Sequence, residues 1–198
     1  MQSLGHRAIA LDPDHDFGFI HRLDVPSSGL VLVAKTYKAY YDLKLQLNVG
    51  SVTRDYVVLC HGWMSPESRE ISARVYWIKD NGLPSKIQRE GKTARTCLKV
   101  LAHAWRGIGE FSLVSVRIIT GRRHQIRMHT AHVQHPTVCD SMYTDSATFQ
   151  SDREWCPRNF LHRYRLAFTD NSGAMQEAMT HVPLDLTKVL ETLEPSNS

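Results

Sequence analysis

The chain has 198 residues, of which 42% are hydrophobic and 22% are charged. This length can bury one substantial core but not two large ones, so we expect a single domain. The formal net charge of +4 and the pI near 8.9 are compatible with a polyanionic partner, but many proteins share that balance and it identifies no function by itself.

The cysteines and the apolar runs indicate the cellular compartment in which the protein is expected. Cys60, Cys97, Cys139 and Cys156 are scattered without a CxxC pair, which favours neither a disulfide framework nor a zinc ribbon. An intracellular, reducing compartment is therefore expected, and the cytoplasm and an organelle such as the mitochondrion fit equally well. The longest apolar runs fall far short of the ~20 residues that span a bilayer. The first 17 residues lack the features of a signal or transit peptide.

The first predicted elements are a strand, a helix and a second strand. Residues 29–34 form a short apolar run opened by glycine, which is typical of a buried strand. Thr36 can cap a helix that ends at Gly50 and carries Tyr40, Leu43 and Leu47 on one face. Branched and aromatic residues predict further strands at 52–60, 96–101, 111–119 and 164–168.

The remaining segments complete an α+β pattern. Two polar stretches, 79–84 and 144–158, are predicted as surface loops. Helices are predicted at 124–133 and, after Pro183, at 184–193. Several strands with a few helices predict a mixed or antiparallel sheet flanked by helices. We delimit a lead-in at 1–18, which is expected to be truncated, one catalytic-type domain at 19–193 and a tail at 194–198.

A possible reactive carboxylate lies in the segment HRLDVPSSGL at 21–30. Asp24 precedes the predicted strand, which would hold it rigidly, while Pro26 and Gly29 shape the bend around it. The same residues also suit an ordinary turn closed by hydrogen bonds from side chains to the backbone. Taken alone, the segment favours the turn.

A basic segment, GRRHQIRMH at 121–129, follows the predicted strand at 111–119. Arg127 is a permanent cation with five donors, able to form a forked pair with a carboxylate and hold it ionised. Arg122 and Arg123 lie close to it in sequence. A solvated basic helix surface is the plainer interpretation, and contact with nucleic-acid phosphates is another.

The histidines near this segment raise the question of a metal. Only His129 and His132 have the helical spacing of metal ligands, and no carboxylate nearby completes a familiar set. We therefore predict no metal site. His124 and His135 are better interpreted as hydrogen-bonding or phosphate-contacting groups.

Tyr56 lies in the strand predicted at 52–60, two residues after Arg54. Its ring offers a flat face on which a nucleobase can stack, and its hydroxyl can accept or relay a proton. A strand tyrosine more often serves only packing, so this residue gains meaning from the other segments.

Together these segments resemble the RluA-type family of RNA pseudouridine synthases. The family reads HRLD, two variable residues and TSGL, and this chain has HRLD at 21–24 and SSGL at 27–30. The family's tyrosine after a basic residue on a strand is matched by Arg54 and Tyr56. Its GRTHQIRxH, followed by HPIxGD and a tyrosine, is matched at 121–129, 135–140 and 143. The resemblance extends from about Phe19 to Leu193.

Two departures from the family pattern stand out. Cys139 occupies a position where the family usually has glycine, so we expect a distorted turn if that turn needs a positive φ. The family's opening strand with a Lys-Pro-x-Gly signature is missing from this chain, so a protein partner or a larger assembly is expected to cover that edge.

The resemblance implies an isomerase that converts uridine to pseudouridine in ribosomal or transfer RNA without a cofactor. It assigns catalysis to Asp24, Tyr56 and Arg127. It implies RNA contacts by Arg22, Arg122, Arg123, His124 and Gln125. It implies structural support of the site by His21, Leu23, Ser28, Gly29, Gly121, Ile126, His135, Pro136 and Asp140. The alternative is a catalytically silent RNA-binding or structural subunit of a large assembly that retains the fold.

Overall fold

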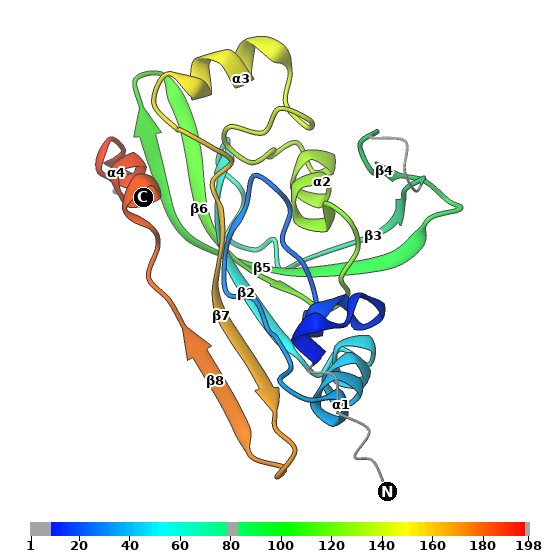
Figure 1. Cartoon of the computed structure of the whole chain (residues 1–198). Coiled ribbons are helices and arrows are strands. Elements are labelled where there is room, and N and C mark those ends of the chain that lie inside the picture. The colour runs from blue at the N-terminus through cyan, green and yellow to red at the C-terminus, as the bar shows by residue number, and fades with distance from the viewer. Residues whose placement is uncertain (1–8, 79–82, 197–198) are drawn as a thin grey trace, which may run out of the picture.

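The computed structural model describes residues 9–78 and 83–196, whose strands form one nine-stranded sheet (Figure 1). The strand order is β1-β7-β2-β6-β5-β3-β4, with β8 paired to β7 and β9 paired to β5. β1 (Ser28–Gly29) pairs in parallel with β7, whereas the other named pairs are antiparallel. The predicted α+β domain with a mixed sheet is confirmed.

The predicted strands form the centre of the sheet as β2 (Thr53–His61), β5 (Lys92–Arg106), β6 (Gly109–Ile118) and β7 (Leu161–Thr169). β5 extends well beyond the predicted 96–101, because many of its residues are exposed and gave no apolar signal. The prediction missed the peripheral strands β3 (Glu70–Tyr76), β4 (Lys86–Ile87), β8 (Met175–Met179) and β9 (Glu194–Pro195). All five residues of β8 are exposed, so no alternation marks it. β9 lies in the segment delimited as a tail and pairs with Ala104 and Trp105 of β5.

Three helices lie where the sequence predicts them. α1 (Tyr37–Asn48) begins after Thr36, whose hydroxyl accepts a hydrogen bond from the amide of Ala39 at 3.2 Å. α2 (Gln125–His132) and α4 (Leu184–Glu191) match the predictions at 124–133 and 184–193. Two short 3-10 helices, η1 (Ile9–Leu11) and η2 (Pro13–Gly18), precede the loop that carries Asp24.

The strand predicted at 29–34 is wrong beyond Gly29. The amide of Leu30 bonds to Arg163 on β7, whereas that of Ala34 bonds to Gly18 on the opposite side. Because the segment changes partner along its length, it forms only β1 and an isolated bridge between Phe19 and Val33.

The loop predicted at 144–158 is also wrong in part, because it contains α3 (Ser146–Arg153). Asp145 caps this helix by accepting hydrogen bonds from the amides of Ala147 and Thr148, both at 3.0 Å. The only buried residue of α3 is Asp152, so the helix has no apolar stripe from which it could be recognised. In the loop predicted at 79–84, residues 79–82 lie outside the described part of the chain.

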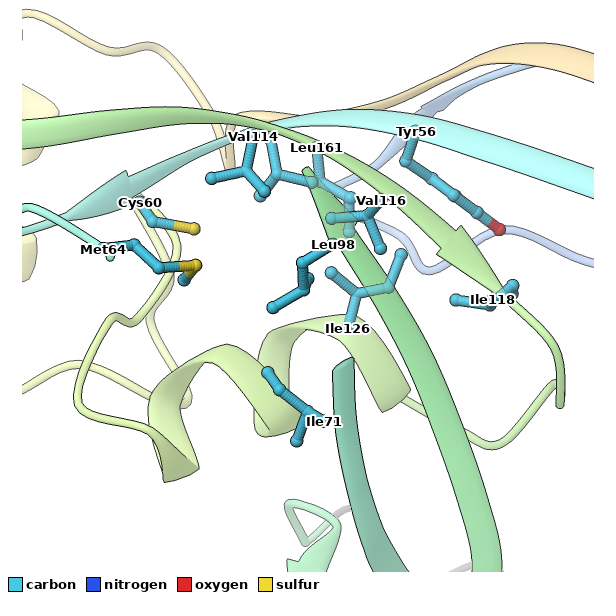
Figure 2. Packing of buried hydrophobic residues seen from close by; sticks show 11 residues of the cluster. Tyr56, Cys60, Met64, Ile71, Leu98, Val114, Val116, Ile118, Ile126 and Leu161 are labelled. Atoms are coloured by element: carbon cyan, nitrogen blue, oxygen red, sulfur yellow. The ribbon is translucent and has the colours of Figure 1, made fainter. Parts of the chain in front are cut away.

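Helices pack on both faces of the sheet and divide its core. Tyr56, Val58 and Cys60 alternate along β2 and point into one cluster, into which Ile126 of α2 also packs (Figure 2). Leu59 points the other way, into a cluster that includes Leu186 of α4. The face covered by α2 therefore carries Tyr56, and it is the face on which the candidate site lies.

Within 9–78 and 83–196, none of the helices combines the length and apolarity needed to cross a membrane. The four cysteines are all unbridged thiols.

Candidate active site

A basic cleft of about 710 Å³ lies on the α2 side of the sheet. The loop of Asp24, strand β2, the end of β6 and the segment before α2 form its walls. Among the described residues that line it, two are acidic, Asp24 and Glu90, and six are cationic: Arg22, Arg54, Lys92, Arg122, Arg123 and Arg163. This excess of positive charge suits a polyanionic ligand.

Asp24 is held by a turn and by the close approach of its loop to β7. The backbone carbonyl of Asp24 accepts a hydrogen bond from the amide of Ser27 at 2.9 Å. Gly29 has φ +122°, and a Cβ there would lie 2.3 Å from the carbonyl oxygen of Arg163. Only glycine fits this position, because both the backbone conformation and the contact exclude a side chain.

Arg127 faces Asp24, but its forked pair is made with another residue. Nη1 of Arg127 lies 3.8 Å from Oδ2 of Asp24. Nε and Nη2 donate to the two carboxylate oxygens of Asp140 at 2.7 and 2.6 Å. The forked pair expected of Arg127 is therefore made with Asp140, and Asp24 lies beside it. Burial alone would lower the pKa of Arg127, but the hydrogen bonds and charge of Asp140, together with Asp24, raise it.

Asp140 is fully enclosed and uses both carboxylate oxygens. Besides Arg127, it accepts hydrogen bonds from the hydroxyl of Thr137 and from the amides of Met142 and Tyr143. Cys139, directly before it, has φ +58°, so the turn does require the positive φ expected for the family's glycine. The amide of Cys139 bonds to Asp152 at 2.7 Å in this turn, and the turn holds Asp140 in its pair with Arg127.

Tyr56 lies in the cleft and is held by Arg163, which no sequence motif had indicated as part of the site. Arg163 of β7 donates two hydrogen bonds to the Tyr56 hydroxyl, the one from Nε at 2.9 Å. Nη1 of Arg163 also bonds to Nδ1 of His21 at 2.8 Å and donates to the carbonyl of Leu30 at 3.0 Å. Arg163 thus ties Tyr56 to both ends of the loop that carries Asp24.

His21 accepts from this arginine as a neutral imidazole. Burial, followed by the positive charges of Arg163 and Arg54, lowers the pKa of His21 to about 3. Neutral His21 keeps one ring nitrogen as an acceptor, and both ring nitrogens face donors: Nδ1 faces Nη1 of Arg163 at 2.8 Å, and Nε2 faces the amide of Leu32 at 3.3 Å.

A second buried arginine, Arg54, lies on β2 two residues before Tyr56 and also lines the cleft. Within residues 9–78 and 83–196, its side chain makes one hydrogen bond, from Nη2 to the carbonyl of Ile119 at 3.2 Å, and its buried Nε has no partner. Burial and the charge of Arg163 lower its pKa. Strand periodicity places residues i and i+2 on one face, so Arg54 was recognisable from its spacing to Tyr56.

The residues expected to contact RNA divide into two groups. Arg22, Arg122 and Arg123 line the cleft, with Arg22 exposed and the other two partly exposed. His124 and Gln125 are buried, which argues against direct contact with RNA. The Gln125 amide bonds to Thr120, Thr96 and the backbone of Arg95 and Arg122, whereas Nδ1 of His124 contacts the Tyr143 hydroxyl at 3.1 Å. Both residues instead support the loop before α2.

The residues expected to support the site surround it. Leu23 and Ile126 pack in the core cluster around Tyr56. The hydroxyl of Ser28 contacts Nδ1 of His162 at 2.9 Å. Further away, the backbone of His61 bonds to the Pro136 carbonyl and to Nδ1 of His135. Among the described residues, no group of three or more His, Cys, Asp or Glu is arranged to hold a metal ion.

Comparison with known proteins identifies relatives of this site and fold. A family model described as RNA pseudouridylate synthase matches residues 7–132. An uncharacterized RNA pseudouridine synthase of Bacillus subtilis is 32% identical over 177 residues, which are 89% of this chain and 55% of that protein. Ribosomal large subunit pseudouridine synthase C of Haemophilus ducreyi is 33% identical over 184 residues, with the same two coverages. The chain thus spans about half the length of these relatives.

Among solved structures, the human RNA pseudouridylate synthase domain containing 1 protein superimposes with a TM-score of 0.75. It is 29% identical, and the match covers 90% of this chain and 74% of the human one. The described sheet and helices are therefore the arrangement found in pseudouridylate synthase domains.

Proposed function

Because the chain belongs to the RNA pseudouridylate synthase family, we propose that it isomerises uridine to pseudouridine in RNA, in the cleft lined by Asp24 and Tyr56. One observation carries this proposal: Asp24, set 3.8 Å from Arg127, shares a basic cleft with Tyr56. A carboxylate and an aromatic face in one cleft, with a cation facing the carboxylate, match what the reaction needs at the ribose and the base.

The reaction moves the base without a change in oxidation state. The bond between C1′ and N1 breaks, the uracil turns, and C5 bonds to C1′; C5 then loses its proton and N1 gains one. Asp24 acts at the ribose, either as a nucleophile at C1′ or as a base at C2′. Arg127 faces the Asp24 carboxylate in both roles, and Asp140 keeps Arg127 in position.

Tyr56 serves the base in this proposal. Its ring lies beside the apolar side chains of Leu23, Ile126 and Leu161, which also line the cleft. A uracil bound there would be shielded from water, and the hydroxyl held by Arg163 is available to the C5 proton transfer. A paired base cannot reach such a site, so the target uridine is flipped out or already unstacked.

The substrate class follows from the charge of the cleft. Arg22, Arg122 and Arg123 line it and provide cations for backbone phosphates. We infer that the substrate is structured RNA, ribosomal or transfer, in which loops present unpaired uridines.

A tritium-release assay tests the proposal. Ribosomal and transfer RNA labelled with tritium at C5 of uridine should release tritium with the wild-type protein, because C5 loses its hydrogen. Asp24→Asn removes the charge at constant size and should lower the rate by about 100-fold or more. Asp14→Asn, at an exposed aspartate that does not line the cleft, is the matched control and should keep the wild-type rate.

The assay also distinguishes the silent alternative. Equal release by the wild type and Asp24→Asn would contradict a catalytic role for Asp24. No release by the wild type, combined with retained RNA binding, would instead favour an RNA-binding or structural subunit.

A further inference from the structure

Three arginines of the described chain are buried, and one of them lacks compensation. Arg127 is paired with Asp140 and faces Asp24. Arg163 donates to the Tyr56 hydroxyl, His21 and a backbone carbonyl. Arg54 has a single hydrogen bond and no carboxylate within 4 Å among the described residues.

An uncompensated buried cation is costly to a folded protein. A charged group removed from water needs a counter-charge or a full set of hydrogen bonds. Arg54 is only 3% exposed, its Nε has no partner, and the neighbouring charge is Arg163, which is also positive. The described residues therefore provide no counter-charge for Arg54.

The surroundings of Arg54 leave space for an anion. Gly121 lines the cleft beside it, and a Cβ at this glycine would lie 2.8 Å from Nη1 of Arg54. No hydrogen bond of Nη1 to a described residue exists. Gly121 thus lets the guanidinium lie against the backbone, and the space for an anion is the cleft of about 710 Å³ that Arg54 lines.

We propose that Arg54 forms an internal phosphate subsite that binds the backbone phosphate next to the target uridine. This inference rests on the proposed function. In that substrate pose, Tyr56 and its apolar neighbours take the uracil and Asp24 faces the ribose. The phosphate attached to the same ribose then binds the Nη1 donors of Arg54 from the cleft. Unlike Arg22 at the exposed part of the cleft, Arg54 would bind one specific phosphate rather than add to general attraction.

Nucleoside and nucleotide probes test this subsite directly. The wild-type protein is titrated with uridine, uridine 5′-monophosphate and uridine 3′-monophosphate, and binding is followed by NMR at low ionic strength. One monophosphate should bind about tenfold more tightly than uridine. Arg54→Gln should abolish this gain, Arg54→Lys should keep much of it, and Arg69→Gln should leave it unchanged. Arg69 is a matched control because it is exposed and lies outside the cleft.

The subsite is contradicted if the phosphate raises affinity equally in the wild type and in Arg54→Gln. It is also contradicted if the wild type binds neither monophosphate more tightly than uridine. If Arg54→Gln does not fold, Gly121→Ala provides the decisive variant. Its methyl group would crowd Nη1 and should reduce the phosphate gain while uridine affinity is retained. An undiminished gain in Gly121→Ala would then contradict the proposal.

The same preparations are assayed for tritium release from RNA, which separates this inference from the proposed function. If the wild type releases tritium but binds neither monophosphate more tightly than uridine, the phosphate subsite is contradicted and the proposed function is not. If a monophosphate binds more tightly than uridine only when Arg54 is present, but no tritium is released from RNA, the isomerase proposal is contradicted and the anion site is supported.

Discussion

Arg127 and Arg54 are both almost completely buried near the candidate site, with exposed fractions of 2% and 3%, but their surroundings differ. Arg127 has two carboxylates within 4 Å, whereas Arg54 has none among the described residues. The described part of the chain therefore supplies the counter-charge for the first arginine and none for the second, for which we propose a ligand phosphate. Arg127 belongs to the scaffold that sets Asp24, and Arg54 belongs to the surface that receives a substrate.

Breaking the pair of Arg127 should have the largest effect on stability. Asp140→Asn leaves a buried guanidinium without its counter-charge and should lower the free energy of unfolding by about 3–5 kcal/mol. Denaturant unfolding measures this loss. The activity of the folded fraction should fall as well, because Arg127 is then free to move away from Asp24.

Asp185→Asn is the matched control for that substitution. Asp185 also forms a forked pair, with Arg158 at 2.7 and 3.1 Å, but its side chain is 41% exposed. A pair in contact with water should cost less than about 1 kcal/mol when it is broken. Similar losses at both positions would show that burial of the Arg127 pair does not determine its contribution.

Lowering the pH should reduce the free energy of unfolding, because the cations Arg163 and Arg54 oppose protonation of His21 in the folded protein. His21 is kept neutral by burial and by Arg163 and Arg54, which lower its pKa to about 3. In the unfolded chain its pKa returns to about 6.5. Between these values the unfolded state binds a proton that the folded state does not, so His21 stabilises the fold fully above pH 6.5 and progressively less below it.

The corresponding measurement is the free energy of unfolding at pH 7 and pH 5. Each such proton lowers it by about 1.4 kcal/mol per pH unit at most, and partial exposure of His21 reduces this value. Buried His129, whose pKa is lowered to about 4, acts in the same direction. His21→Asn should therefore show a smaller loss on acidification than the wild type. An unchanged loss would contradict the neutral state of His21.

The contrast between the two arginines also shows what the sequence can reveal. Arg127 belongs to a motif of closely spaced residues, and its pairing with a carboxylate was predictable, although the choice of Asp140 over Asp24 was not. Arg163 comes from β7, more than a hundred residues from Tyr56, and no local pattern indicates that the two meet. Such contacts depend on strand order, which the sequence pattern did not specify.

Local sequence patterns predicted the wrong secondary structure in two segments, where the burial of residues does not follow their polarity. The apolar run at 29–34 resembles a strand, yet its backbone changes partners from β7 to Gly18. The polar run at 144–158 resembles a loop, yet it contains α3, whose one buried residue is Asp152. In both segments tertiary contacts decide the conformation, and they override the composition.

Replacing the unpaired arginine should change stability in the opposite direction to the loss of a paired one. Arg54→Gln removes a buried charge and keeps an amide that can donate to the carbonyl of Ile119. We expect the ligand-free protein to become more stable by about 1 kcal/mol. Arg127→Gln, the same substitution at the paired site, should destabilise it by leaving Asp140 uncompensated. If both variants lose stability equally, Arg54 is compensated in the folded protein.

The smallest expected effect concerns the backbone that places Asp140. Cys139 has φ +58°, a conformation that costs a residue with a Cβ about 1 kcal/mol relative to glycine. Cys139→Ala keeps this cost, whereas Cys139→Gly removes it, and both lose the packing of the buried thiol. The glycine variant should therefore be more stable than the alanine variant by about 1 kcal/mol in thermal or denaturant unfolding.

At an ordinary helical position the order is reversed, and this provides the control. Gln150 is exposed in the middle of α3, where Gln150→Gly should be less stable than Gln150→Ala by about 1 kcal/mol. If alanine is the more stable residue at 139 as well, the turn before Asp140 does not hold the left-handed conformation in solution. The scaffold around Arg127 would then be free of strain. If the glycine variant is the more stable, residue 139 adopts an unfavourable backbone conformation in the turn that places Asp140. The buried ion pair between Asp140 and Arg127 then offsets this cost in free energy.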